Sequence, residues 1–173
     1  AAPARPAVRS GQPGVVGAFI VPGSPLPLLV RHNPPWMPLI QGYEAARKSI
    51  EELAPDAIAI YSTQWIAVLD QLWQSRQRLI GTHVDENWHE YGELPYDMTI
   101  DTALTEAAVK ACVGIGVTAK SVDYDQFPID TGTIVANTML NPTGRAKLVI
   151  AANNLYHDFA ATRRLGAMLA EQA

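Results

Sequence analysis

The run Ala57-Ile58-Ala59-Ile60-Tyr61 decides the fold class, because it is apolar at every position, with Pro55-Asp56 before it and the polar Ser62–Trp65 stretch after it. A run that is apolar on both alternating faces predicts a strand covered on both sides. Val15–Val21 (VVGAFIV) and Leu148–Ala152 (LVIAA) have the same character. We therefore predict adjacent buried strands whose core includes Phe19, Ile20, Ile58, Ile60, Val149 and Ile150.

Stretches with helical spacing separate these runs. We predict a helix from about Trp36 to Leu53 that ends at Pro55-Asp56, a second from Asp101 or Thr102 to Gly114 or Gly116, a short third over Asp130–Leu140, and a last one with the stripe Phe159, Thr162, Leu165 and Leu169. Further strands are predicted at Leu79–Val84 and Val117–Val122, and a long polar loop at Asp85–Asp97. This alternation predicts a three-layer α/β/α domain with a mixed or largely parallel sheet.

Composition limits the classes of partner. The chain has 173 residues, of which 48% are hydrophobic and 17% charged, so we expect one α/β domain over residues 15–173 behind a flexible arm at residues 1–14. A net charge of −4 argues against nucleic acid as a partner. The sequence contains no run of about 18 apolar residues, so it predicts no membrane span. The single cysteine, Cys112, excludes an internal disulfide and fits a cytoplasmic protein.

Candidate functional residues lie in loops beyond strand ends, where α/β proteins place their chemistry. His83, Asp85 and His89 form the one local cluster with residue types that bind Fe(II), although the same loop is equally typical of a polar interface. His157, after Tyr156, is either a general base or a residue that satisfies backbone groups beside a helix capped by Asp158.

Several short stretches, in order along the chain, resemble the LigB-type (class III) extradiol ring-cleaving dioxygenases. They are Gly17–Pro25, Asn33–Trp36, Tyr61–Trp65, His83–His89, Phe127–Thr133 and Asn153–His157. The resemblance implies the family's fold, and within the family it indicates a subunit that pairs with a homologous catalytic beta subunit.

The departures from the family pattern concern the iron ligands. Where active members carry a histidine turn after the first strand, this chain has Pro22-Gly23-Ser24-Pro25, and where they carry His-Trp it has Gln64-Trp65. The family's Asp-His-Gly turn reads Asp130-Thr131-Gly132. A neutral amide is a poor substitute for imidazole on Fe(II). The family pattern also continues beyond the last residue here, so a complete domain and one continued at its C-terminus both stay open.

The resemblance therefore implies a non-catalytic alpha subunit of a heteromeric dioxygenase for 2-aminophenol or a related catechol-like aromatic. We expect no metal in this chain, Fe(II) in the beta subunit, and a heterotetramer. The expected pocket or interface residues are Gln64, Trp65, His83, Asp85, His89, Thr131, Tyr156 and His157. Two alternatives stay open, a metal-dependent enzyme that uses His83, Asp85 and His89, and a small-molecule binder on a degenerate scaffold.

Overall fold

The computed structural model describes residues 14–173, so the predicted arm lies outside the described residues except for Gly14. The helices are α1 (Leu26–Leu29), α2 (Met37–Leu53), α3 (Thr102–Cys112), α4 (Thr131–Leu140) and α5 (Phe159–Gln172), with 3₁₀ turns at Pro34–Trp36, His89–Tyr91 and Val113–Ile115. The strands are β1 (Ala57–Ala67), β2 (Gln71–Gln74), β3 (Arg78–His83), β4 (Leu94–Thr99), β5 (Ala119–Val122) and β6 (Lys147–Asn154). No helix among these residues is both long and apolar enough to cross a membrane.

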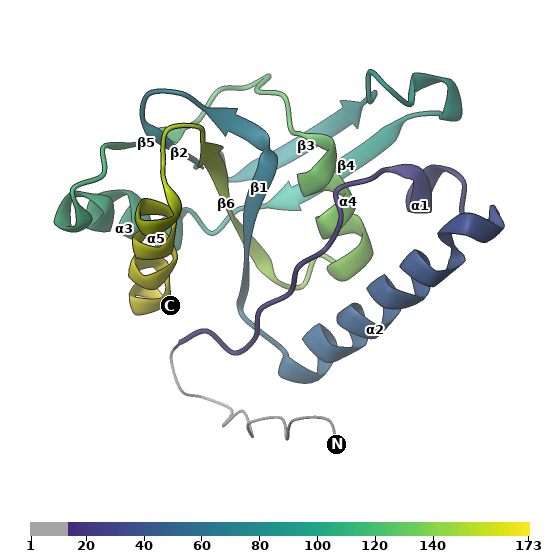
Figure 1. Cartoon of the computed structure of the whole chain (residues 1–173), viewed down its shortest axis with the longest axis horizontal. Helices are drawn as coiled ribbons and strands as arrows, with labels where there is room; N and C mark the ends of the chain where they lie inside the picture. Colours follow the sequence, from purple (N-terminus) through teal and green to yellow (C-terminus); the bar gives the residue numbers. More distant parts are fainter. Residues whose placement is uncertain (1–13) are drawn as a thin grey trace.

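A mixed sheet of four strands, in the order β1-β6-β2-β5, forms the centre of the domain (Figure 1). β1 and β6 run parallel from Ala57↔Lys147 to Ala67↔Asn154, with a register shift between Ser62 and Ile66. β2 pairs parallel with β5, and it meets β6 antiparallel at Trp73↔Ala151. β3 and β4 form a separate antiparallel hairpin.

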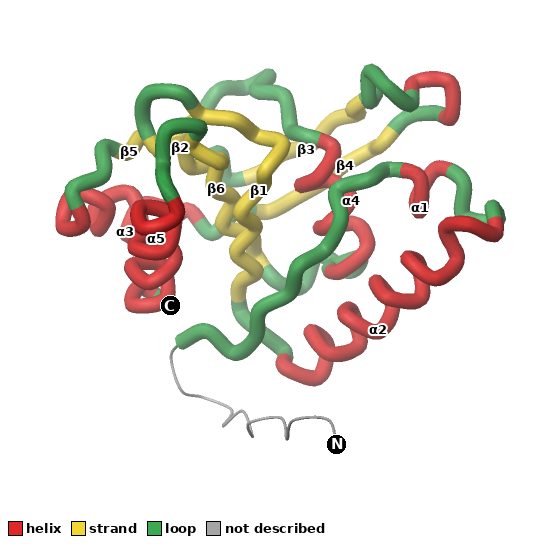
Figure 2. Tube along the Cα trace, in the orientation of Figure 1, coloured by secondary structure: helices red, strands yellow, loops and turns green. Residues whose placement is uncertain are grey.

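Helices cover both faces of the sheet, which confirms the predicted three-layer architecture (Figure 2). On one face α3 and α5 pack on Trp73, Val149 and Ala151. On the other face α4 packs with Ile134 on Leu148 and Ile150, and α2 packs with Tyr43 on α4. Alternate residues of β6 thus enter opposite cores, as expected for a strand buried on both faces.

The predicted strand at Val15–Val21 is wrong. Residues 15–24 form no strand and run as an irregular segment along the outer side of the β1–α2 region towards α1 (Figure 1). Phe19 is 40% exposed and Ile20 fully exposed, whereas Val21 packs against the α2–α4 core. An apolar run indicates burial but does not supply a hydrogen-bonding neighbour, and this segment pairs with no strand.

Three other predictions need correction, and one strand was not predicted. β1 continues through the polar stretch Ser62–Trp65, where the sequence predicted its end, because the chain stays extended beside β6 up to Ala67. β4 occupies the end of the predicted loop Asp85–Asp97, because it pairs with β3 over its whole length. β2 was missed because Gln71 and Gln74, both fully buried, hide the apolar signal of a core strand. Phe159 does not belong to the buried stripe of α5, since it is 84% exposed.

Candidate functional site

The carboxyl end of β1, the N-terminus of α4 and the loop Pro22–Pro25 meet around the side chain of Gln64. Gln64 Nε2 donates to the Gly23 carbonyl oxygen at 3.3 Å, and Gln64 Oε1 accepts from the Gly132 backbone N–H at 2.6 Å. Both ends of the amide are therefore hydrogen-bonded to backbone groups that lie far apart in sequence.

Two glycines allow this close approach. A Cβ built on Gly23 would lie 2.7 Å from Gln64 Nε2 and 3.0 Å from the Gly132 Cα, and one on Gly132 would lie 3.0 Å from Gln64 Oε1. Any larger residue would displace the amide or the loop. The amide thus sits in a tightly packed contact among three segments.

Asp130 links the same two elements, the end of β1 and the N-terminus of α4, beside the Gln64 amide. As the N-cap of α4 it accepts from the Thr133 backbone N–H at 2.9 Å and from Thr133 Oγ1 at 2.8 Å. It also accepts from Ser62 Oγ at 2.6 Å, and Ser62 is only 5% exposed. Both carboxylate oxygens accept hydrogen bonds, so Asp130 ties β1 to the start of α4. The sequence signal for this role was available, since Asp130 followed by Thr133 is typical of an N-cap.

Thr131 joins two of the predicted loop residues. Its Oγ1 donates to Asp85 Oδ2 at 2.5 Å and lies 2.9 Å from His83 Nε2. Because the hydroxyl has one proton and gives it to the carboxylate, His83 Nε2 must carry a proton and donate to Thr131. Thr131 therefore fastens the β3–β4 hairpin to α4.

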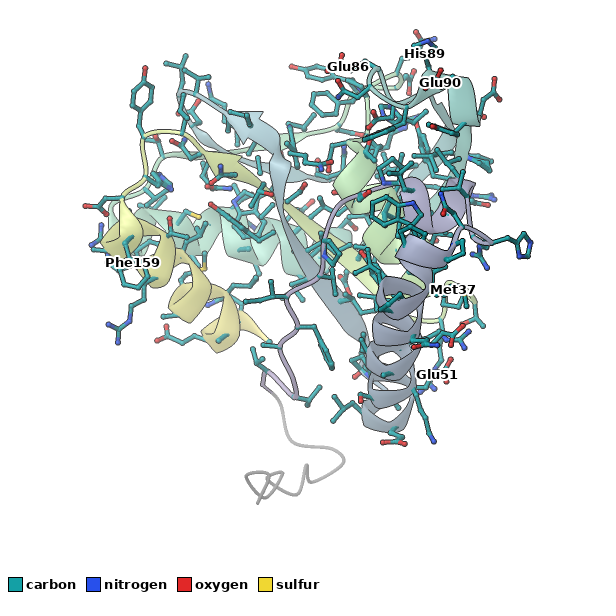
Figure 3. All side chains as sticks on the ribbon, turned by 45° about the vertical axis from the view of Figure 1, so that its right-hand side comes forward. Met37, Glu51, Glu86, His89, Glu90 and Phe159 are labelled. Carbon is teal, nitrogen blue, oxygen red and sulfur yellow. The ribbon has the colours of Figure 1, made fainter. Side chains whose placement is uncertain are left out.

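His89 does not join this group. Its Nδ1 lies 3.2 Å from the Glu86 carbonyl oxygen, and its side chain points outward at the tip of the β3–β4 hairpin, with Glu86 and Glu90 nearby (Figure 3). Over residues 14–173, no three His, Cys, Asp or Glu side chains are placed to share a metal ion. The geometry thus does not assemble the alternative set of His83, Asp85 and His89.

Trp65, Tyr156 and His157 lie around this corner without meeting at Gln64. Trp65 packs edge-on against Phe127 at 5.5 Å between ring centroids, within the core beneath α4. Tyr156 is 76% exposed beyond the end of β6. His157 donates its backbone N–H to the Asn154 carbonyl at 3.2 Å, and its Nδ1 is buried without a hydrogen-bond partner among the described residues.

Asp158 caps α5 by accepting from the Ala161 N–H at 2.7 Å, as predicted. This places His157 immediately before a helix start, and both of its predicted roles, as a general base and as a residue that satisfies backbone groups, stay predictions.

The donors at this corner do not fit an Fe(II) centre. Non-haem Fe(II) sites of this kind use two imidazoles and a carboxylate with open positions. Here the amide of Gln64 is bonded at both ends, Asp130 accepts three hydrogen bonds, and His83 and Asp85 are both bonded to the Thr131 hydroxyl. The hydrogen bonds of this corner connect protein segments to one another.

Comparison with known proteins agrees with the predicted resemblance. Residues 23–172 match the family model described as the catalytic LigB subunit of aromatic ring-opening dioxygenase. The chain is 49% identical over 155 residues to the 2-aminophenol 1,6-dioxygenase alpha subunit of a Pseudomonas species, covering 89% of this chain and 57% of the relative. It is 30% identical over 164 residues to the beta subunit, covering 89% and 53%.

A third relative, the 3,4-dihydroxyphenylacetate 2,3-dioxygenase of Escherichia coli, is 25% identical over 129 residues, covering 73% of this chain and 47% of the relative. The chain spans about half the length of the curated relatives it matches. With the family model matched along nearly all of the described residues, the chain belongs to the LigB family of aromatic ring-opening dioxygenase subunits.

Proposed function

We propose that this chain is a non-catalytic, alpha-type subunit of a heteromeric extradiol dioxygenase. In this proposal a homologous beta-type subunit binds Fe(II), the aromatic substrate and O₂, and cleaves the ring. The substrate is 2-aminophenol or a related catechol-like compound, and the complex is a cytoplasmic heterotetramer. The substrate class and the pairing follow the names of the alpha and beta relatives, both of which align with 89% of this chain.

The observation that carries the proposal is the use of Gln64. At the position where active family members carry a metal-binding histidine, this chain has an amide whose oxygen and nitrogen both hold backbone groups. Recruiting this side chain to a metal would break the bond to Gly132 and still provide only a weak ligand. The residue is thus used to join segments of the fold, which supports a subunit that acts through assembly.

The proposal is tested with three samples, namely this chain alone, its homologous beta-type subunit alone, and the two co-expressed. Each is loaded anaerobically with Fe(II), desalted, assayed for bound iron by mass spectrometry, and then exposed to O₂ with 2-aminophenol or catechol. We expect iron and ring cleavage in the samples that contain the partner, with higher activity in the complex. One equivalent of tightly bound iron together with turnover in this chain alone would refute the proposal.

A further inference from the structure

An uncharged apolar surface lies at the carboxyl ends of β1 and β6 and on the first turn of α5. We call it the β1–α5 face, and it consists of Ile66, Val68, Leu69, Leu155, Tyr156 and Phe159, which are between 49% and 87% exposed. Hydrogen bonds join the segments that follow β1 and β6: the Leu155 N–H donates to the Ala67 carbonyl oxygen at 2.8 Å, and Asn154 Nδ2 donates to the Leu69 carbonyl oxygen at 3.5 Å. Figure 3 shows Phe159 on the outer side of α5.

The exposed area of this face is similar to the area that one partner contributes to a stable interface. With roughly 150–250 Å² for a large side chain, these exposed fractions correspond to on the order of 800 Å², the area that each partner contributes to a standard protein–protein interface. Exposed apolar patches of this size on a folded chain mark interaction sites.

The distribution of charge has the anatomy of an interface. Residues 57–69 and 148–157 contain no Asp, Glu, Lys or Arg. Charges begin at the border, with the Asp70–Lys120 ion pair at 2.8 Å on one side and Asp158 and the exposed Arg163 on the other. A depleted core with a charged rim is the pattern of a buried contact.

A cavity of about 190 Å³ between the sheet and α5 borders this face. Its lining is mainly apolar and includes Ile60, Tyr61, Trp73 and Leu169. Tyr61 connects it to the face, since Tyr61 Oη donates to Asn153 Oδ1 at 2.7 Å and Asn153 is paired in register with Ile66. A side chain from another polypeptide could therefore anchor beside the face.

We propose that the β1–α5 face is the surface on which the homologous beta-type subunit docks. This rests on the proposed function. The alpha and beta relatives both align with 89% of this chain, so the partner carries its own counterpart of β1, β6 and α5. Two related chains can then meet through equivalent faces around a pseudo-twofold axis, the commonest geometry for paired subunits.

Photo-crosslinking in the co-expressed complex tests the surface. Phe159 is replaced with p-benzoylphenylalanine, and Tyr124, an aromatic residue of similar exposure (69%) outside the face, serves as the matched control position. We expect irradiation to join this chain to the beta-type subunit from position 159 and not from position 124. A product formed within this chain, or between two copies of it, would overturn the proposal, as would no product at 159 in an intact complex.

A charge substitution provides the second measurement. Phe159→Asp should raise the Kd for the partner at least about 30-fold, the loss typical of an interface hot spot, whereas Tyr124→Asp should leave it unchanged. Unchanged affinity of Phe159→Asp contradicts the docking surface; if that variant does not fold, the crosslink decides. If the complex is intact and active but shows neither the crosslink from position 159 nor weaker binding of Phe159→Asp, the docking surface is wrong and the proposed function stands. If the two wild-type chains do not associate, the proposed function is wrong as well.

Discussion

Replacing Gln64 with alanine removes the amide that links the Pro22–Pro25 loop, β1 and α4. The bond from the Gly132 N–H is short, at 2.6 Å, and the bond to the Gly23 carbonyl is long, at 3.3 Å. Gln64→Glu keeps an acceptor for Gly132 but replaces the donor to Gly23 with a carboxylate oxygen that repels the Gly23 carbonyl oxygen.

The size of the effect follows from these bonds and from exposure. A neutral hydrogen bond contributes about 0.5–1.5 kcal/mol to stability, and a long one lies at the low end of that range. Gln64 is solvent-exposed, so water replaces part of what is lost. We expect Gln64→Ala to lower the free energy of unfolding by about 1–2 kcal/mol, which corresponds to a fall in Tm of roughly 3–6 °C for a chain of this size.

Urea titration followed by circular dichroism measures this change, with calorimetry for Tm. Gln77→Ala is the matched control, since Gln77 is exposed and lies between β2 and β3, and surface changes of this kind stay within about 0.5 kcal/mol. Gln64→Glu should also be less stable than the wild type, because one oxygen of its carboxylate faces the Gly23 carbonyl oxygen. If Gln64→Ala is no more destabilising than Gln77→Ala, the amide does not join the three segments and the central observation behind the proposed function is lost.

Three further predictions concern neighbouring contacts. Asp130→Ala should lower the free energy of unfolding in urea by about 2–3 kcal/mol, because Asp130 caps α4 and also accepts a hydrogen bond from Ser62. Asp158→Ala, which removes only the exposed cap of α5, should lower it by about 1 kcal/mol. Equal losses for the two variants would contradict this. Burial raises the pKa of Tyr43 to about 12, so the stability that this residue contributes is complete below pH 10 and is lost as pH rises towards 12. Tyr43→Phe should therefore flatten the dependence of the free energy of unfolding on pH in this range. An unchanged dependence would contradict the prediction. Thr131→Val should lower the free energy of unfolding by about 1–3 kcal/mol, because it leaves Asp85 without its hydroxyl donor. His89→Ala should have no measurable effect on unfolding. A larger loss of stability for His89→Ala than for Thr131→Val would show that other contacts hold the hairpin.

The central layer of the fold could be predicted because its sequence signals are local. Ala57–Tyr61 of β1 and Leu148–Ala152 of β6 are continuous apolar runs, and α4 begins at a recognisable cap, so the element type follows from the residues themselves. Val15–Val21 has the apolar character of the first half of β1 but lies outside the sheet, although β1 is an edge strand, so apolar residues alone do not decide whether a segment pairs. β2 shows the opposite case, since it is a core strand that contains buried polar residues; Gln71 Nε2 donates to the Ala152 carbonyl oxygen at 2.7 Å within the core.

The candidate site could be located from sequence but not understood from it. The family resemblance implies that ligand positions are lost at Pro22–Pro25 and at Gln64, and that Thr131 replaces the histidine of the family's Asp-His-Gly turn. What has been gained depends on groups more than 40 residues away, namely Gly23, Gly132 and Asp85, and only the folded arrangement brings them within bonding distance.

The hydrogen bonds of this corner connect the same kinds of segment that a metal centre would connect. Gln64 joins a loop, a strand and a helix start, Asp130 joins the strand to that helix, and Thr131 joins the helix to the β3–β4 hairpin. A few such bonds contribute a few kcal/mol, a substantial part of the 5–15 kcal/mol by which a typical domain is stable. A chain with these links can hold the carboxyl edge of its sheet in place without a bound ion.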